Sequence, residues 1–139
     1  MKQIRRCVSI LLACMCLLTS TAFASEKASD QIASYSIYVA PAGDGQIGME
    51  FSITAPDFME EIGAKNITIY EITPSGYKLR AEYTKDDPGM IEIDSWFQAN
   101  TLYFNGVAGK TYYVTVTVFA TDYNGGSDSR TKSFTVTAT

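Results

Sequence analysis

The chain of 139 residues contains no histidine, and its three cysteines all lie within the first 16 residues. Beyond Cys16 it therefore lacks the imidazole and thiolate groups that form most zinc sites, bind haem iron or build Ser-His-Asp and Cys-His catalytic sites. It also lacks the one side chain whose unperturbed pKa lies near 7. Acid–base catalysis would have to rely on carboxylates alone, as in glycosidases. We therefore expect a protein that is not an enzyme and that holds no metal ion or cofactor.

Residues 1–24, MKQIRRCVSILLACMCLLTSTAFA, have the pattern of a secretory signal peptide. A basic start is followed by an apolar run of about 12 residues and by a cleavage site at Ala22-Phe23-Ala24. The run is shorter than the roughly 20 residues that a membrane-spanning helix needs. We predict cleavage, secretion and no membrane span. An alternative is a lipobox in the sequence LLAC, which would attach a lipid to Cys14 and hold the protein at the cell surface.

Positive charge is scarce once this leader is removed. All 15 acidic residues remain but only eight of the 11 basic ones, because Lys2, Arg5 and Arg6 lie in the leader. A net charge of −7 repels phosphate backbones, so we do not expect nucleic-acid binding. No cysteine remains to form a disulfide, so the stability of the chain must come from its apolar core.

Polar and apolar residues alternate along most of residues 32–139, a period that is typical of half-buried β-strands. The strongest alternation covers residues 47–53, 77–83 and 112–119, and shorter segments cover 35–39, 67–69, 91–93, 102–104 and 134–138. Clusters of Gly, Pro, Asn and Asp separate these segments as turns. The pattern predicts an all-β antiparallel sandwich of about seven strands, preceded by a flexible polar N-terminus over residues 25–31.

Two local features refine this prediction. Residues 112–119 are uncharged, proline-free and rich in Val, Thr and aromatics, so an exposed edge strand there would favour aggregation. We therefore expect this strand to have a neighbour on each side. Residues 57–62 carry the signals of a single helical turn, with Asp57 as N-cap, Glu60 as its capping partner and Gly63 as the terminating glycine.

The C-terminal third carries a resemblance. Residues 108–118, AGKTYYVTVTV, followed by a Gly-rich loop and SFTVT at 133–137, resemble the last two strands of a fibronectin type III domain. This implies an immunoglobulin-like sandwich in which Val114 and Val116 face inward. It also implies that the hydroxyl of Tyr112 bonds backwards to the backbone, in the tyrosine corner of that fold. Phe51 takes the place of the tryptophan usual in the family's second strand.

A second resemblance covers residues 58–71, FMEEIGAKNITIYE. This segment is similar to one in an uncharacterised family of small secreted proteins of Gram-positive bacteria. The resemblance implies a bacterial secreted protein and brings no activity with it.

Several carboxylates could support a hydrolase in principle. The candidates lie in turns or in the polar phase of predicted strands, where the ordinary expectation is a solvated side chain: Glu50, Glu60, Glu61, Glu82, Asp86 and Asp87. Spacing along the chain does not exclude that two of them meet across strands, so a carboxylate-dependent secreted hydrolase stays an alternative.

The segment DYNGGSD at residues 122–128 offers oxygen atoms of Asp122, Asn124 and Asp128 at short spacing, with Tyr123 between them. It does not match an EF-hand loop. A turn that uses Asn-Gly is the favoured interpretation, and a calcium site is the weaker one. We treat Asp122, Tyr123, Asn124 and Asp128 as candidate contact residues.

Outward-facing aromatic side chains are the better functional indication. If Tyr112, Val114 and Val116 face the core, the alternation turns four aromatic side chains outward, and these are Tyr38, Tyr70, Tyr113 and Phe119. Such rings suit a sugar or a protein partner. We predict a small secreted acidic binding module, non-enzymatic, that contacts a protein or a glycan through these residues and the loops at 55–66 and 122–130. A self-associating structural subunit of the surface is the remaining alternative.

Overall fold

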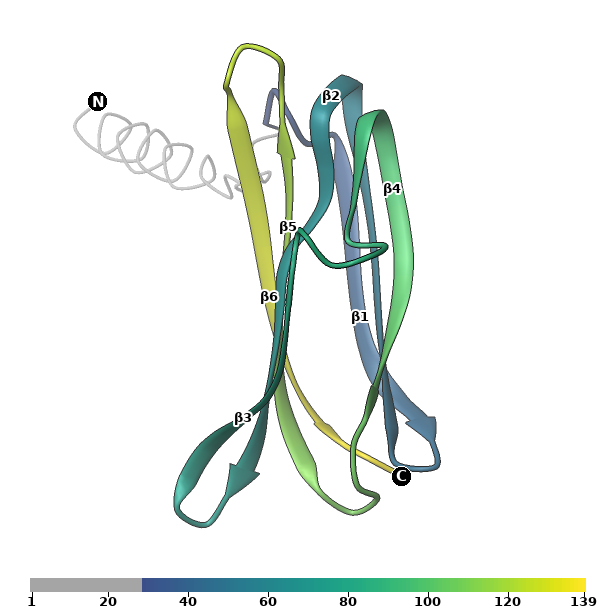
Figure 1. Ribbon diagram of the computed structural model, residues 1–139, viewed down its shortest axis with the longest axis vertical. Helices are drawn as coiled ribbons and strands as arrows, with labels where there is room; N and C mark the ends of the chain where they lie inside the picture. Colours follow the sequence, from purple (N-terminus) through teal and green to yellow (C-terminus); the bar gives the residue numbers. More distant parts are fainter. Residues whose placement is uncertain (1–28) are drawn as a thin grey trace, which may run out of the picture.

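The computed structural model describes residues 29–139, so the predicted signal peptide, Cys14 and residues 25–28 lie outside the described part. Six antiparallel strands make up the fold (Figure 1), and they are β1 (Ser34–Gly43), β2 (Gln46–Thr73), β3 (Gly76–Thr84), β4 (Ile91–Asn105), β5 (Thr111–Thr121) and β6 (Ser127–Thr137). The predicted all-β class is confirmed. Among residues 29–139, no helix has the length and hydropathy to cross a membrane.

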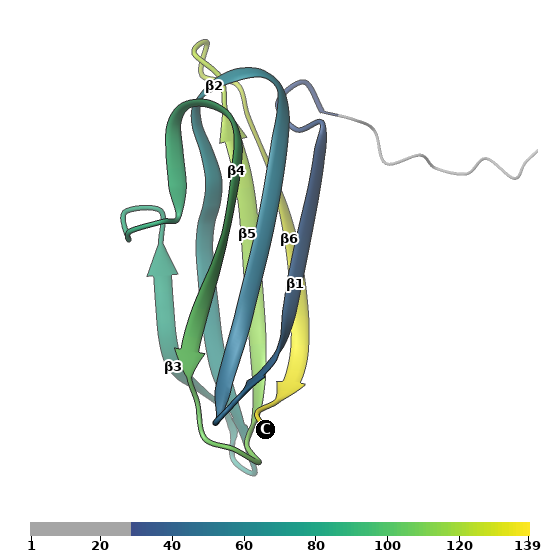
Figure 2. The ribbon, with the colours of Figure 1, turned by 90° about the vertical axis from the view of Figure 1, so that its right-hand side faces the viewer.

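Strand β2 takes part in two layers. Its residues 46–54 pair with β1 on one side and with residues 97–105 of β4 on the other. Its residues 61–73 pair with β3 and β5, residues 61–63 also pair with residues 91–93 of β4, and β5 pairs with β6. Figures 1 and 2 show the result: β1, the first half of β2 and most of β4 face a second layer of β3, the rest of β2, β5 and β6.

The core lies between these layers. It is formed by the inward stripes of the strands, and its fully buried side chains include Ile47, Met49, Phe51, Ile53, Ile67, Ile69, Val114, Val116 and Val118. Each such side chain contributes roughly 1.5–3 kcal/mol when it leaves water. The predicted inward positions of Tyr112, Val114, Val116 and Phe51 are confirmed. So is the prediction for residues 112–119, because β5 lies between β2 and β6.

The hydroxyl of Tyr112 accepts a hydrogen bond from the backbone N–H of Val107 at 2.9 Å. The bond runs backwards to the loop before β5, as the resemblance implied. The ring of Phe104 stands edge-on to Tyr112 at 5.4 Å, so the tyrosine ties the end of β4 to the start of β5.

The strand count and one local prediction differ from the structure. The expected strands at 47–53 and 67–69 are parts of the single strand β2, and those at 91–93 and 102–104 are parts of β4, which leaves six strands. The helical turn predicted for residues 57–62 is wrong, because this segment is extended. Its backbone pairs with β4 at Met59 and with both β4 and β5 at Glu61, whereas a one-turn helix would leave most of its polar backbone groups unpaired.

Gly63 is needed where these strands meet. It pairs with Ile91 of β4 and with Phe119 of β5, and its φ angle is +151°. A Cβ atom at this position would lie 2.2 Å from the carbonyl oxygen of Met90 and 2.7 Å from the Cα of Ile91. The close approach lets the next amide, that of Ala64, donate to Met90 at 2.8 Å.

We expect Gly63→Ala to lower the free energy of unfolding by about 3 kcal/mol or more, because it adds backbone strain to a clash with fixed backbone atoms. Gly125→Ala is the matched control. Gly125 also has a positive φ, +82°, but nothing lies within 4 Å of its added Cβ, so about 1 kcal/mol should be lost. Urea unfolding of both variants measures the difference, and equal losses would show that the close approach at Gly63 does not matter.

Candidate functional site

Three segments meet at one end of the molecule. They are the part of β2 that passes between the layers, the bend of β4 and the loop between β5 and β6, and Figures 1 and 2 both place them at the same end. The bend of β4 occurs at Asp94, whose φ of 51° is unusual for a residue other than glycine. Met59 pairs with Ser95, and the hydroxyl of Tyr123 donates to the carboxylate of Asp94. These two contacts join the three segments.

Large apolar side chains are exposed on this end. They are Phe58, Ile93, Trp96, Phe97 and Tyr123, and we call the surface that they form the aromatic end. Trp96 is 51% exposed, and Phe58 and Tyr123 are more exposed still. The rings of Trp96 and Phe97 lie 5.9 Å apart at an angle of 43°. Rigid aromatic side chains that gather on a surface are typical of binding sites.

The aromatic end is also acidic. Residues 54–63, 91–98 and 121–127 contain six acidic residues and no lysine or arginine. Four of these carboxylates are exposed, namely those of Asp57, Glu60, Glu92 and Asp94. The pKa of Tyr123 is raised by its hydrogen bond to Asp94, by burial, and by the charges of Asp94 and Glu60. Asp94 bonds to Tyr123, and Glu60 follows Met59, which pairs with Ser95, so both carboxylates belong to the segments that carry the aromatic surface.

The loop at 122–126 is held by Asp122. Its Oδ1 atom accepts hydrogen bonds from the backbone N–H groups of Asn124 and Gly126. Its Oδ2 atom accepts a hydrogen bond from Gln31 Nε2 at 2.9 Å. The bond from Gln31 and those from the two backbone groups hold the pKa of Asp122 below its usual value. The hydrogen bond from Gln31 also connects the end of the N-terminal segment 25–31, which the sequence analysis expected to be flexible, to this loop. Asp122 and the Asn-Gly pair therefore shape a turn, which is the favoured sequence interpretation.

Asp128 lies at the start of β6 and bonds to its neighbours. Burial alone would raise its pKa, but hydrogen bonds from Ser29, Arg130 and the Ser129 backbone lower it on balance. Arg130 lies 2.6 Å from the carboxylate. No group of three or more His, Cys, Asp or Glu residues comes together within residues 29–139 in a way that could hold a metal ion.

The four predicted outward aromatics do not form one patch. Tyr38 is 71% exposed but lies on β1, in the other layer from the rest. The prediction that Phe119 is exposed is wrong, because only 5% of it is accessible. Val118, Phe119 and Ala120 are all buried, so β5 is enclosed on both faces at the level where it pairs with residues 61–63 of β2.

Tyr70 and Tyr113 do come together, directly opposite each other on β2 and β5. Tyr77 of β3 contacts both rings, at 6.3 Å from Tyr70 and 5.6 Å from Tyr113. Cross-strand aromatic contacts of this kind stabilise a sheet by roughly 0.2–1 kcal/mol each. In strict alternation Tyr77 would share a face with Ala81, but Arg80 is skipped in the register of β3, which turns Tyr77 outward.

A groove lies on the outer face of the other layer. Tyr38 and Tyr103 border it, Gly48 forms part of its lining, and its volume is about 180 Å³. A Cβ at Gly48 would be 3.5 Å from the Tyr103 ring, so the missing side chain leaves the space that the tyrosine borders. Glu50 and Thr101 line the same groove with polar oxygens.

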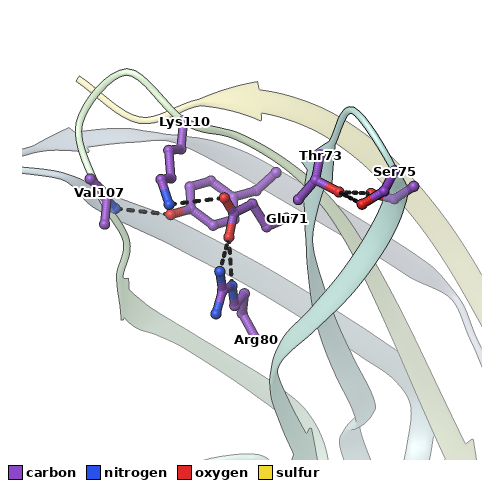
Figure 3. Close-up of polar contacts among 8 residues, drawn as sticks. Glu71, Thr73, Ser75, Arg80, Val107 and Lys110 are labelled. Carbon is purple, nitrogen blue, oxygen red and sulfur yellow. Dashed lines mark hydrogen bonds and ion pairs between the residues drawn. The ribbon is translucent and has the colours of Figure 1, made fainter.

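An ion cluster that the sequence analysis missed lies at the opposite end from the aromatic end. Glu71 is buried, with Arg80 Nε at 2.6 Å and Lys110 Nζ at 3.0 Å from its carboxylate, and Figure 3 shows the carboxylate between the two cations. Together with Val107 and Tyr112 they border a cavity of about 440 Å³. Glu71 lies at the next inward position of β2 after Ile67 and Ile69. A charged residue at an inward position could have indicated an ion pair from the sequence, because a buried charge needs a partner.

The sequence analysis also missed most of the aromatic end. A usable signal was the adjacency of Trp96 and Phe97, since neighbouring side chains on a strand point to opposite faces and a half-buried strand hides only one of them. Tyr123 was the one residue of the aromatic end that the sequence analysis named individually as a contact. The predicted contact loop at 55–66 is strand, yet it supplies Phe58 to this end.

No family model and no curated protein matches the chain.

We expect acid to destabilise the protein partly through Glu71. Hydrogen bonds from Lys110 and then Arg80 hold its pKa below the usual 4.5, so the unfolded chain takes up the proton first. The contribution of Glu71 is therefore complete above about pH 4.5 and is lost as the pH falls through the lower folded-state pKa.

The measurement is the urea midpoint at about pH 6 and about pH 3 for wild type and Glu71→Gln. The midpoint of the variant should fall less on acidification than that of wild type. Glu50→Gln removes an exposed carboxylate outside the cluster and should behave as wild type. If all three proteins lose the same amount, Glu71 does not contribute to the acid sensitivity.

Proposed function

We propose that this chain is a small secreted, acidic, non-enzymatic binding module with an immunoglobulin-like sandwich of the fibronectin type III kind, and that it binds a protein through the aromatic end. The fold part is supported by the two facing antiparallel layers and by the backward hydrogen bond of Tyr112. If the two halves of β2 are counted separately, the layers hold seven strands, as that fold does.

The observation that carries the binding proposal is the exposure of five large apolar side chains on one end of the molecule. Trp, Tyr and Phe at the centre of an interface supply much of its binding energy, because they bury a large area with few rotatable bonds. The pairs Thr54–Phe97 and Met59–Ser95 flank Phe58 and Trp96, and together with the Tyr123–Asp94 contact they limit the ordering cost of binding.

The clear pKa shifts of the described carboxyls do not favour the alternative of a hydrolase. A carboxyl that acts as a general acid near neutral pH needs a raised pKa. Glu71, Asp122 and Asp128 are the described carboxyls with a clear shift, and the pKa of each is lowered. Each of them is bonded to cationic, amide or hydroxyl groups that favour its charged form.

Glycan binding is a second candidate function, and the groove at Tyr38 and Tyr103 favours it. Aromatic rings at its border suit the apolar faces of a sugar, and Glu50 and Thr101 supply hydrogen-bond acceptors beside them. This groove and the aromatic end involve different residues, so their roles can be tested separately.

Peptide display tests protein binding at the aromatic end. A random peptide library is selected on the wild-type protein, and the enriched peptides are titrated against Trp96→Ser and Tyr38→Ser. We expect affinity to fall about tenfold or more for Trp96→Ser, which is about 1.4 kcal/mol, and to stay unchanged for Tyr38→Ser. Failure to enrich any peptide whose binding depends on Trp96 would count against the proposal.

A glycan array tests the second candidate. If the groove binds sugars, wild type and Trp96→Ser should label the same glycans, and Tyr103→Ala should lose that labelling because one aromatic wall is gone. Labelling that survives in Tyr103→Ala would remove the groove as a glycan site.

A further inference from the structure

The free charges on the aromatic end have one sign. Within the described residues, the three segments of the aromatic end form one ion pair with a cation, in which Lys85 Nζ lies 2.8 Å from the carboxylate of Glu61. The carboxylates of Asp57, Glu60, Glu92 and Asp94 form no ion pair among residues 29–139. An uncompensated acidic surface attracts cations and repels anionic membranes, nucleic acids and acidic proteins.

Position matters as much as charge. Asp94 is held against the aromatic surface because its carboxylate accepts a hydrogen bond from the hydroxyl of Tyr123. Glu60 follows Met59, whose backbone pairs with Ser95 next to Asp94. Ser95 separates Asp94 from Trp96 by one residue in the bend of β4. Carboxylates and ring faces are therefore available to one bound group at the same time.

Lysine and arginine are the side chains that can use both features. Their cationic heads bind carboxylates, their aliphatic stems pack on apolar surface, and they are attracted to the faces of Trp, Tyr and Phe. The chain already makes one such contact elsewhere, where Lys132 Nζ lies 5.2 Å from the ring centre of Tyr35. A neutral sugar could stack on the rings but would leave the acidic charge unused.

We infer that the partner of the aromatic end is a cationic polypeptide segment, in which Lys or Arg residues alternate with apolar ones. This inference rests on the proposed binding function and narrows it to one class of partner. The apolar residues would cover Phe58 and Phe97, and the cations would lie between the ring of Trp96 and the carboxylates of Asp94 and Glu60. Charge complementarity should also make the affinity depend on salt.

The chain provides its own probe for the test, because Trp96 is its only tryptophan. Two synthetic peptides of about 12 residues are titrated, one of alternating Arg and Leu and one with every Arg replaced by Gln, and Trp96 fluorescence is recorded. We expect the Arg peptide to change the fluorescence and to bind at least about tenfold more tightly than the Gln peptide. Raising the salt concentration from about 50 to about 300 mM should weaken the binding of the Arg peptide.

Two double variants with the same change of net charge separate the site from general attraction. Asp94→Asn with Glu60→Gln removes the carboxylates beside the aromatic surface, and Asn is chosen because it tolerates the positive φ at residue 94. Asp44→Asn with Glu82→Gln removes two exposed carboxylates outside the three segments of the aromatic end. The first double variant should bind the Arg peptide about tenfold less tightly, and the second should bind it as wild type does.

Three results would overturn the inference: equal binding of the two peptides, equal weakening in the two double variants, or binding by calorimetry with no change in Trp96 fluorescence. The display experiment separates this failure from failure of the proposed function. Selected peptides that depend on Trp96 but lack Lys and Arg would leave the protein-binding function in place and remove the cationic partner. Circular dichroism of both double variants establishes that they are folded.

Discussion

The hydrogen bonding of β2 to four other strands connects the whole fold. Its residues 46–54 belong to the layer of β1 and β4, and its residues 61–73 belong to the layer of β3 and β5. A strand shared in this way makes the two layers one unit, because neither can lose its pairing with β2 without disturbing the core between them. Gly63 makes the crossing possible, since the backbone at Met90 approaches it too closely for any side chain.

The same crossing explains why the candidate site lies at one end. Both β2 and β4 pass from one layer to the other there, and the bend of β4 uses the positive φ of Asp94. Side chains at the crossing are not all directed into the core, so Phe58, Trp96 and Phe97 remain exposed. Phe58 and Trp96 lie at the shift of register between β2 and β4, and Phe97 pairs with Thr54 beside it. At the opposite end, Glu71, Arg80 and Lys110 neutralise one another in part. The two ends therefore differ in both charge and apolar exposure.

Much of the fold followed from alternation, because a period of two identifies the buried stripe without knowledge of the partners. Phe51, Tyr112, Val114 and Val116 were placed correctly on that basis. Predictions failed where long-range pairing overrode local signals. The capping pattern at Asp57 gave way to pairing with β4, and burial of Phe119 depends on neighbours that are distant in sequence. The aromatic end could not be predicted as a unit, because its members come from three segments that only the fold brings together.

Native-state amide hydrogen exchange tests the shared strand most directly. The amides of Met49 and Phe51 in the first half of β2 and those of Ile67 and Ile69 in the second half should exchange with one opening free energy, equal to that of global unfolding. Exchange of one half through a separate opening of lower free energy, with the other half still protected, would contradict the account. The layers would then be independent units, and β2 would not hold the aromatic end in place.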